Sequence, residues 1–354
     1  MSSLVDKSLL EQLRRLPDPE RSGKWPTERL NCLRDAGVFG WGLPTELGGR
    51  VVDSADLLEG YLDLAHACLT TAFILTQRDA ACHRIAVSTN GELRQRLLPD
   101  HCAGRAMATV GISHLSTSRQ HWSKPSVIAN RTSDGFELTG EAPWVTGAGH
   151  VDLLVTGATL ESGDQILVAI PAGRRGLGIG APMKLLALDA AETGTVLLDH
   201  VLVGSDEVIC GPLPNVMKIG PTGGTGSLTT TAVATGAAAR TLDGLKRELS
   251  ARPELAVVIE PLACEHATLK AELLLTARDS LDASPLRAIA ESLRFRANSL
   301  AARLAQAYLC CAKGAGFVSG HPAEQSLREA MFFQVWSCPP AVTTRTLTEL
   351  ASES

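Results

Sequence analysis

The feature that most constrains the fold is a change of hydrophobic period in the middle of the chain. From residue 105 to about 208, apolar residues recur at every second position, which is typical of half-buried β-strands. The segments on both sides have the longer period of amphipathic helices. At 354 residues the chain can bury a large core and form two or three domains. We therefore predict an α+β multidomain protein, with a helical domain at 1–104, a β domain at 105–215 and a helical bundle at 216–354.

The middle segment predicts about six short strands separated by turn residues such as Asp134 and Gly135. Short strands at regular spacing are typical of a small antiparallel barrel or sandwich. The expected strands are 106–112, 126–130, 135–139, 153–156, 166–170 and 195–203. No dinucleotide-binding or P-loop motif follows any strand, which argues against a Rossmann or P-loop site. We interpret the glycine-rich stretch 173–182 as a loop.

Amphipathic spacing predicts helices on both sides of the strands. Helix-stopping glycines and prolines, such as Gly37, Pro99 and Gly104, set their ends. The predicted helices are 27–37, 54–75, 77–88 and 91–104 before the strands, and 228–249, 261–281, 284–313 and 324–335 after them.

Composition excludes several kinds of partner. A net charge of -5 and a pI near 6.0 leave no basic surplus to neutralise phosphates, so we expect no nucleic-acid or anionic-membrane partner. No segment approaches the roughly 18 uninterrupted apolar residues of a membrane span, and the charged N-terminus is unlike a secretory signal. Nine cysteines without C-x-x-C spacing indicate reduced thiols and a cytoplasmic protein. No cluster has ligand spacing, so no metal site is expected.

Residues 138–158 (LTGEAPWVTGAGHVDLLVTGA) predict two strands that meet at a glycine-containing turn. Because residues two apart in a strand point to one face of the sheet, we expect Trp144 and Thr146 to lie side by side. A flat aromatic wall beside a small hydroxyl suits a planar, hydrogen-bonding ligand. The alternative is a core tryptophan with a threonine that fills the strand.

The motif G-x-x-W-[IV]-T, followed by a small-residue turn and an apolar strand, resembles the flavin-facing strand of the acyl-CoA dehydrogenase family. LRDAGVFGWGLPTELGG (33–49) and ELRQRLLPDHCAGRA (92–106) are similar to that family's N-terminal domain, and the motifs occur in the family's order. The resemblance implies FAD as cofactor. It places Trp144 on the flavin ring, with Val145 beside it, and Thr146 near the flavin N5.

The resemblance also implies further cofactor contacts. The family's T-E-P-x-A-G-S-D motif corresponds to VGISHLSTSRQ (110–120), in which hydroxyls and backbone N–H groups remain but the acidic residue is replaced by His114. Candidate cofactor-binding residues there are Gly111, Ile112, Ser113 and Ser118. In the family's glycine-rich turn near the adenosine, Gly314 and Gly316 fit the pattern, whereas its glutamine is missing. Either His114 or His121 could act as an acid or base, or be a loop residue without a catalytic role.

The catalytic position departs from the family. Its base is a glutamate that follows a helix similar to Arg328–Trp336, and Ser337 stands at that place here. A hydroxyl cannot replace a carboxylate as base without a partner. The other helix that carries the glutamate in some members, around 228–236, has no acid. The chain therefore resembles a divergent member without the usual catalytic Glu, and its catalytic residue is unknown. Cys338 is a thiolate candidate or, more simply, a structural thiol.

Three functions fit these observations. The first is an FAD-dependent oxidoreductase of the acyl-CoA dehydrogenase type, acting on an acyl thioester or a related small molecule. The second is a flavin-dependent monooxygenase of the same fold, since oxygen insertion needs no α-proton base. The third is a non-catalytic descendant that serves as a binding or scaffold subunit. The resemblance further implies a homodimer or homotetramer assembled through the C-terminal helices.

Overall fold

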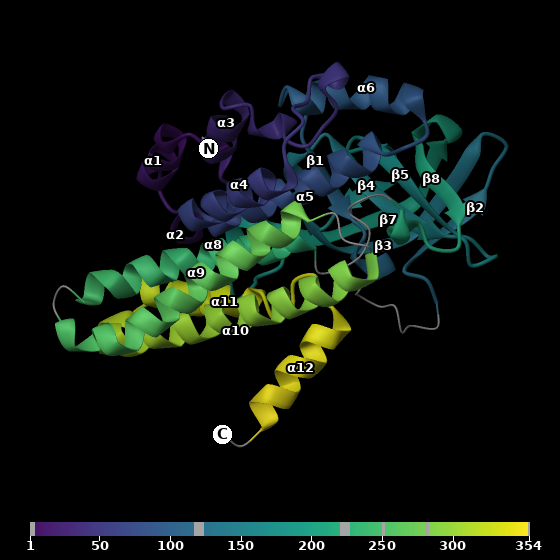
Figure 1. The fold of residues 1–354 in the computed structure, drawn as a ribbon. Coiled ribbons are helices and arrows are strands. Elements are labelled where there is room, and N and C mark those ends of the chain that lie inside the picture. The colour runs from purple at the N-terminus through teal and green to yellow at the C-terminus, as the bar shows by residue number, and fades with distance from the viewer. Residues whose placement is uncertain (1–3, 117–123, 220–226, 250–251, 280–282, 353–354) are drawn as a thin grey trace.

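The computed structural model describes residues 4–116, 124–219, 227–249, 252–279 and 283–352. It shows the predicted order of a helical part, a central sheet and a second helical part, with the helices of both ends packed beside the sheet (Figure 1). Within these residues, no helix is both long and apolar enough to cross a bilayer.

The N-terminal part is built on two consecutive helices, α4 (Ser54–Ala67) and α5 (Leu69–Ala86). Asp53 caps α4 by accepting a hydrogen bond from the Ala55 N–H. We predicted a break near residue 76, and this was wrong. The chain is extended at Cys68, which separates the two helices eight residues earlier. The other helices here are α1 (Lys7–Arg15), α2 (Pro19–Ser22), α3 (Thr27–Asp35) and α6 (Gly91–Cys102).

The central sheet has eight strands, two more than predicted. Along its main path the order is β6 (Leu177–Ile179), β7 (Thr193–Gly204), β3 (Gly135–Thr146), β2 (Val127–Arg131), β4 (Leu153–Thr159), β5 (Gln165–Pro171) and β8 (Val208–Leu213). The stretch 173–182, interpreted as a loop, contains β6 as an edge strand. The one-turn helix α7 (Ser113–Ser116) follows β1 (Ala108–Gly111).

The sheet is mixed and not wholly antiparallel. β1 runs parallel to β4, with Ala108 opposite Leu153 and Gly111 opposite Thr156. The helices α4 and α5 precede β1, so this strand enters the sheet from the helical side and does not form a hairpin with its neighbour. Most other neighbours, including β3 with β7 and β4 with β5, are antiparallel as predicted.

Two apolar layers meet at β4 and β5. Leu153 and Val155 pack into one core with α5 and α6, whereas Leu154 belongs to the interior between the two halves of the sheet. Successive side chains of a strand point to opposite faces, so a strand buried on both sides must be apolar throughout. The run 153–155 has this pattern, and it places β4 at the centre.

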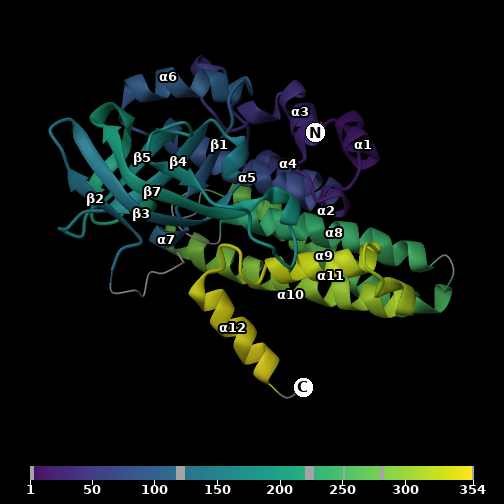
Figure 2. The same ribbon diagram turned by 180° about the vertical axis from the view of Figure 1, so that it is seen from behind.

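The C-terminal part is a bundle of long helices, α8 (Leu228–Leu249), α9 (Ala256–Arg278), α10 (Ala283–Gly316) and α11 (Pro322–Phe332). These helices share one apolar core with α1, α3, α4 and α5. Figure 2 shows the long helices lying beside α4 and α5. A Cβ on Gly236 would lie 2.2 Å from the Leu62 carbonyl oxygen, so α8 and α4 approach closely at this glycine.

The last helix, α12 (Pro340–Ala351), projects away from the bundle (Figure 1). The short 3-10 helices are Val38–Gly40, Thr45–Leu47, Ala148–His150, Asp189–Ala191, Ser205–Glu207, Val216–Lys218 and Pro253–Leu255.

Candidate functional site

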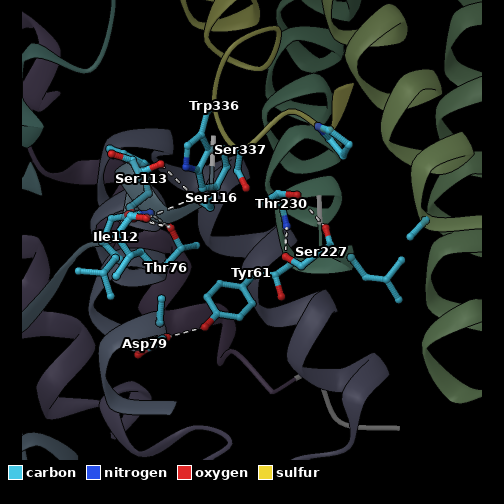
Figure 3. Close-up of a pocket in the computed structure, with 18 of the residues that line it drawn as sticks. Tyr61, Thr76, Asp79, Ile112, Ser113, Ser116, Ser227, Thr230, Trp336 and Ser337 are labelled. Atoms are coloured by element: carbon cyan, nitrogen blue, oxygen red, sulfur yellow. Dashed lines mark hydrogen bonds between the residues drawn. The ribbon is translucent and has the colours of Figure 1, made fainter. Parts of the chain in front are cut away.

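A cavity of about 1560 Å³ lies where the three parts of the molecule meet. α4 and α5 form one wall, the ends of β1 and β3 a second, and the start of α8 and the end of α11 a third. Figure 3 shows Ser113 and Ser116 near Trp336 and Ser337, with Thr230 and Ser227 on the side of α8. Hydrophobic and polar side chains both line the space, as in small-molecule sites.

Trp144 and Thr146 both line this cavity. The Trp144 side chain is 50% exposed and is not packed in the core, whereas Thr146 is only 2% exposed. Trp144 has a φ of 60°, and the β3–β7 register shifts between Ala142 and Val145. This bulge turns the indole outward while Val145 stays in the sheet interior.

Hydroxyl groups follow the same edge of the sheet. The Thr146 Oγ1 lies 3.1 Å from the Thr193 Oγ1, and both threonines line the cavity. Only one hydroxyl proton is used in that hydrogen bond, so the other is available to a ligand. The Ser113 Oγ donates its proton to the Pro143 carbonyl oxygen at 2.8 Å, which leaves it as an acceptor. The Thr146–Thr193 pair therefore offers one donor at this wall.

The floor of the cavity carries a buried polar cluster. The Tyr61 hydroxyl donates to Asp79 Oδ2 at 2.5 Å, and Arg78 donates to Asp79 Oδ1. Arg78 also donates to the His101 carbonyl oxygen and lies over the Phe39 ring. Burial, together with the neighbouring Asp79 carboxylate, holds the pKa of Tyr61 well above its ordinary value, so the phenol stays protonated.

The wall opposite the sheet is aromatic. Phe332 and Trp336 stack with ring centroids 5.1 Å apart, and Phe73 meets both edge to face. Arg294 donates to the carbonyl oxygens of Phe333 and Trp336, which fixes the backbone just before Ser337. Ser337 has a φ of 46° and lines the cavity next to Trp336. The position expected for the base thus faces the cavity, and it carries a hydroxyl.

Three carboxylates line the cavity in the described part of the chain: Asp79, Asp279 and Glu291. Asp79 is 3% exposed, and both of its oxygens already accept hydrogen bonds. Glu291 accepts from Arg287, one turn earlier on the exposed start of α10, and Asp279 is itself exposed. None of the three is both buried and free to accept a proton from a ligand.

The structure brings together only some of the residues proposed as cofactor contacts. Ile112, Ser113, Trp144 and Thr146 line the cavity, and so does Ser337. Ser118 and His121 lie outside the described residues. His114 is buried, with its Nε2 3.0 Å from the Gly157 carbonyl oxygen. The other predicted residues do not line the cavity: Gly111 and Val145 are buried in the sheet, and Gly314 and Gly316 lie at the end of α10.

Several lining residues were not predicted. Tyr61, Asp79 and Arg84 come from α4 and α5, where a polar residue in a helix normally faces solvent. Thr193 pairs with Thr146 across two strands, and only the strand register shows this. Trp336 ends the segment Arg328–Trp336 that resembles a helix of the family, and its aromatic ring was a sequence signal for a ligand wall. Within the described residues, no group of three His, Cys, Asp or Glu side chains is placed to hold a metal ion.

Comparison with known proteins supports the architecture. Residues 2–105 match the family model "Acyl-CoA dehydrogenase, N-terminal domain". A probable acyl-CoA dehydrogenase of Mycobacterium bovis is 27% identical over 238 residues, covering 63% of this chain and 35% of that protein. The chain spans about a third of the length of the first curated relatives it matches.

Solved structures extend the likeness to the whole chain. Butyryl-CoA dehydrogenase from Megasphaera elsdenii superposes with a TM-score of 0.82 at 16% identity, covering 98% of this chain and 94% of that one. The dibenzothiophene monooxygenase TdsC from Paenibacillus sp. A11-2 gives 0.80 at 16% identity, covering 97% and 94%. The fold is that of the acyl-CoA dehydrogenases, with a cavity at the junction of the three parts. The chain is thus similar to acyl-CoA dehydrogenases in its fold and, over residues 2–105, in its sequence.

Proposed function

We propose that this protein is a flavin-dependent oxidoreductase of the acyl-CoA dehydrogenase type, which binds FAD and an acyl thioester or a related activated acid in the cavity at the junction of its parts. The observation that carries the proposal is the outward-facing indole of Trp144 beside the Thr146–Thr193 pair. The cavity of about 1560 Å³ exceeds the roughly 300–1,000 Å³ usual for one drug-sized ligand. It therefore has room for a ring system together with a second molecule.

The residues present fit a flavin. Its three fused rings need an aromatic or apolar wall and a hydrogen-bond donor along one edge. Trp144 supplies the wall, and the Thr146–Thr193 pair supplies a donor. Ile112 and the aromatic wall of Phe332 and Trp336 would exclude water from the same space. A bound flavin supplies two-electron chemistry. The protein's part is to orient the substrate and to accept its proton.

Proton acceptance is where this chain departs from its relatives. Ser337 occupies the expected position of the base, and the buried carboxylate, Asp79, is already paired with Tyr61 and Arg78. These observations favour a second candidate, an oxygen-using flavin monooxygenase, because oxygen insertion needs no base for an α-proton. The likeness in fold to a dibenzothiophene monooxygenase is compatible with this candidate. We also propose a homodimer or homotetramer in the cytoplasm, by analogy with the family.

The test is an absorption spectrum of the purified protein, followed by thermal unfolding with and without FAD or FMN. A ligand bound only by the native state raises the unfolding midpoint. We expect a flavin spectrum and a raised midpoint, with FAD more effective than FMN. A colourless protein whose midpoint neither flavin moves would reject both flavin functions and leave the scaffold role. Acyl-CoA oxidation with an artificial electron acceptor, against oxygen consumption with a supplied flavin reductase, then separates the two enzymes.

A further inference from the structure

Arg84, on the last turns of α5, is a buried cation that has no partner among the residues the structure describes. It lines the cavity and is only 4% exposed. Its Nε and Nη1 atoms are inaccessible to solvent and make no hydrogen bond. In the described part of the chain, no hydrogen bond or ion pair joins Arg84 to another residue. A buried charge is costly unless it is paired, so this arrangement needs an explanation.

The other buried arginines show how unusual Arg84 is. Arg29 donates to the carbonyl oxygens of Leu13 and Leu16. Arg78 is paired with Asp79, and Arg294 donates to two carbonyl oxygens at the end of α11. In each of these cases the fold supplies an acceptor. At Arg84 the acceptor has to come from elsewhere.

The surroundings of Arg84 supply no carboxylate. The ionisable group with a resolved influence on it is the Cys210 thiol of β8, while burial lowers the pKa of Arg84. Asp79 lies on the same helix, and its oxygens are taken by Arg78 and Tyr61. The lining residues from the segment after β8 are Asn215, Met217 and the exposed Lys218.

Arg84 also has a defined place along the cavity. It follows Thr76 by eight residues on α5, which corresponds to about 12 Å along a helix. Both residues line the cavity, and Figure 3 shows Thr76 beside Ile112, near the proposed flavin wall. Arg84 therefore lies away from Thr76, at the end of α5 that neighbours Cys210 of β8.

We propose that this end of the cavity binds an anionic group of the ligand, a carboxylate or a phosphate, with Arg84 as its principal partner. The proposal deepens the proposed function and rests on it, since it takes this cavity as the ligand site. The anion is either the free acid at the far end of an acyl group or a phosphate of its carrier. Guanidinium groups pair with both, often through two parallel hydrogen bonds.

Isothermal titration of the flavin-free protein tests the proposal directly. The probes are glutarate and adipate for the acyl acid, free coenzyme A for the carrier, inorganic phosphate, and glutaramide as an uncharged analogue. We expect Arg84→Gln to weaken binding of the effective anion by about tenfold or more, because a charge-assisted hydrogen bond is lost. Arg84→Lys should retain part of the affinity, and glutaramide should bind both proteins equally.

Arg175→Gln is the matched control, because it removes one positive charge from an exposed site between β5 and β6. Folding is checked by thermal unfolding without ligand. There Arg84→Met should melt no lower than the wild type, since it removes an unpaired buried charge.

If Arg84→Gln weakens the binding of coenzyme A alone, the anion is a phosphate of the carrier. If it weakens the binding of the dicarboxylates, the anion is the free acid at the acyl end. If no probe binds the wild type, or if Arg84→Gln binds all of them as tightly, the proposal is wrong. Flavin uptake, followed by absorbance, should be the same in both proteins, so failure of the flavin assignment is seen separately.

Discussion

The Tyr61 hydroxyl lies 2.5 Å from Asp79 Oδ2, and this hydrogen bond links α4 to α5 at the floor of the cavity. Both residues are buried, and the second carboxylate oxygen of Asp79 is held by Arg78. The cluster joins the two helices that form one whole wall of the site. It therefore connects the stability of the N-terminal part to the shape of the cavity.

Tyr61→Phe removes this hydrogen bond and leaves one carboxylate oxygen buried without its donor. We expect the free energy of unfolding to fall by about 1–3 kcal/mol, measured by urea denaturation at neutral pH. Tyr308→Phe is the matched control. Tyr308 is also buried, and within the described residues its hydroxyl makes no hydrogen bond, so its loss should change stability by less than about 0.5 kcal/mol. Equal effects of the two substitutions would show that the Tyr61–Asp79 bond contributes nothing specific.

The contact between α8 and α4 depends on a glycine. A Cβ at Gly236 would lie 2.2 Å from the Leu62 carbonyl oxygen and 2.9 Å from the Ala65 Cβ. Gly236→Ala should therefore push the helices apart and cost about 1–3 kcal/mol of unfolding free energy. Gly314→Ala, where an added Cβ meets nothing within 4 Å, is the control and should be neutral or slightly stabilising. Thermal and urea unfolding of the two variants measure the difference.

Sequence periodicity predicted the order of helices and strands, which is a local property because it depends only on which residues alternate along one segment. For Trp144 the pattern left two alternatives, a ligand wall and a core residue, and the bulge that turns the indole outward depends on the pairing of β3 with β7. The parallel pairing of β1 with β4 is not local, and neither is the register that brings Thr193 to Thr146. β6 has only three residues, one of them a glycine, so it left no period to detect.

The helical side of the site was missed for a different reason. Asp79 and Arg84 are charged residues on a helix, and in most helices such residues face solvent. α5 is instead buried over most of its length between β1, α4 and α8, so its polar side chains can only pair with one another or face the cavity. That burial follows from tertiary packing, which the hydrophobic pattern of α5 alone does not contain.

Replacing Trp144 should affect ligand binding far more than folding. Its side chain is half exposed on the cavity, so Trp144→Ala removes little core packing and should change the unfolding free energy by less than about 1 kcal/mol. If the indole packs on a flavin ring, the flavin dissociation constant should rise about tenfold, and Trp144→Phe should restore most of it. Leu197→Ala is the control for general loss of apolar surface, because Leu197 is also half exposed but lies on the neighbouring strand β7. Unchanged flavin affinity in Trp144→Ala would remove the indole from the cofactor site.

Acid should destabilise the protein through two histidines, the buried His101 and the half-buried His266. Burial lowers the pKa of His101 and of His266 below the ordinary value of 6.5. The unfolded chain then binds protons that the folded chain does not, so the unfolding free energy falls as the pH drops through about 6.5. Each histidine contributes at most about 1.4 kcal/mol per pH unit.

Urea denaturation at several pH values between about 7.5 and 5.5 measures this slope. His101→Gln should reduce it. His200→Asn is the control, since His200 is exposed and its pKa is raised by the hydrogen bond to Glu137, the opposite direction. If His101→Gln keeps the full slope of the wild type, this residue is not the source of the acid sensitivity.

Ser337 offers a test of which reaction the cavity supports. It lines the cavity, and the sequence resemblance predicts the base at this position. Arg294 fixes the backbone before it. If the protein binds flavin and acyl thioester but lacks only the proton acceptor, Ser337→Glu should increase oxidation of an acyl-CoA by about 10²- to 10⁴-fold. Ser337→Ala should leave the wild-type rate unchanged.

The measurement is reduction of an artificial electron acceptor. Circular dichroism confirms folding, because the introduced Glu must adopt the same φ of 46° as Ser337. No gain in a folded, flavin-loaded Ser337→Glu protein would mean that the cavity does not present an α-proton to this residue, and the oxygen-using reaction would become the better assignment.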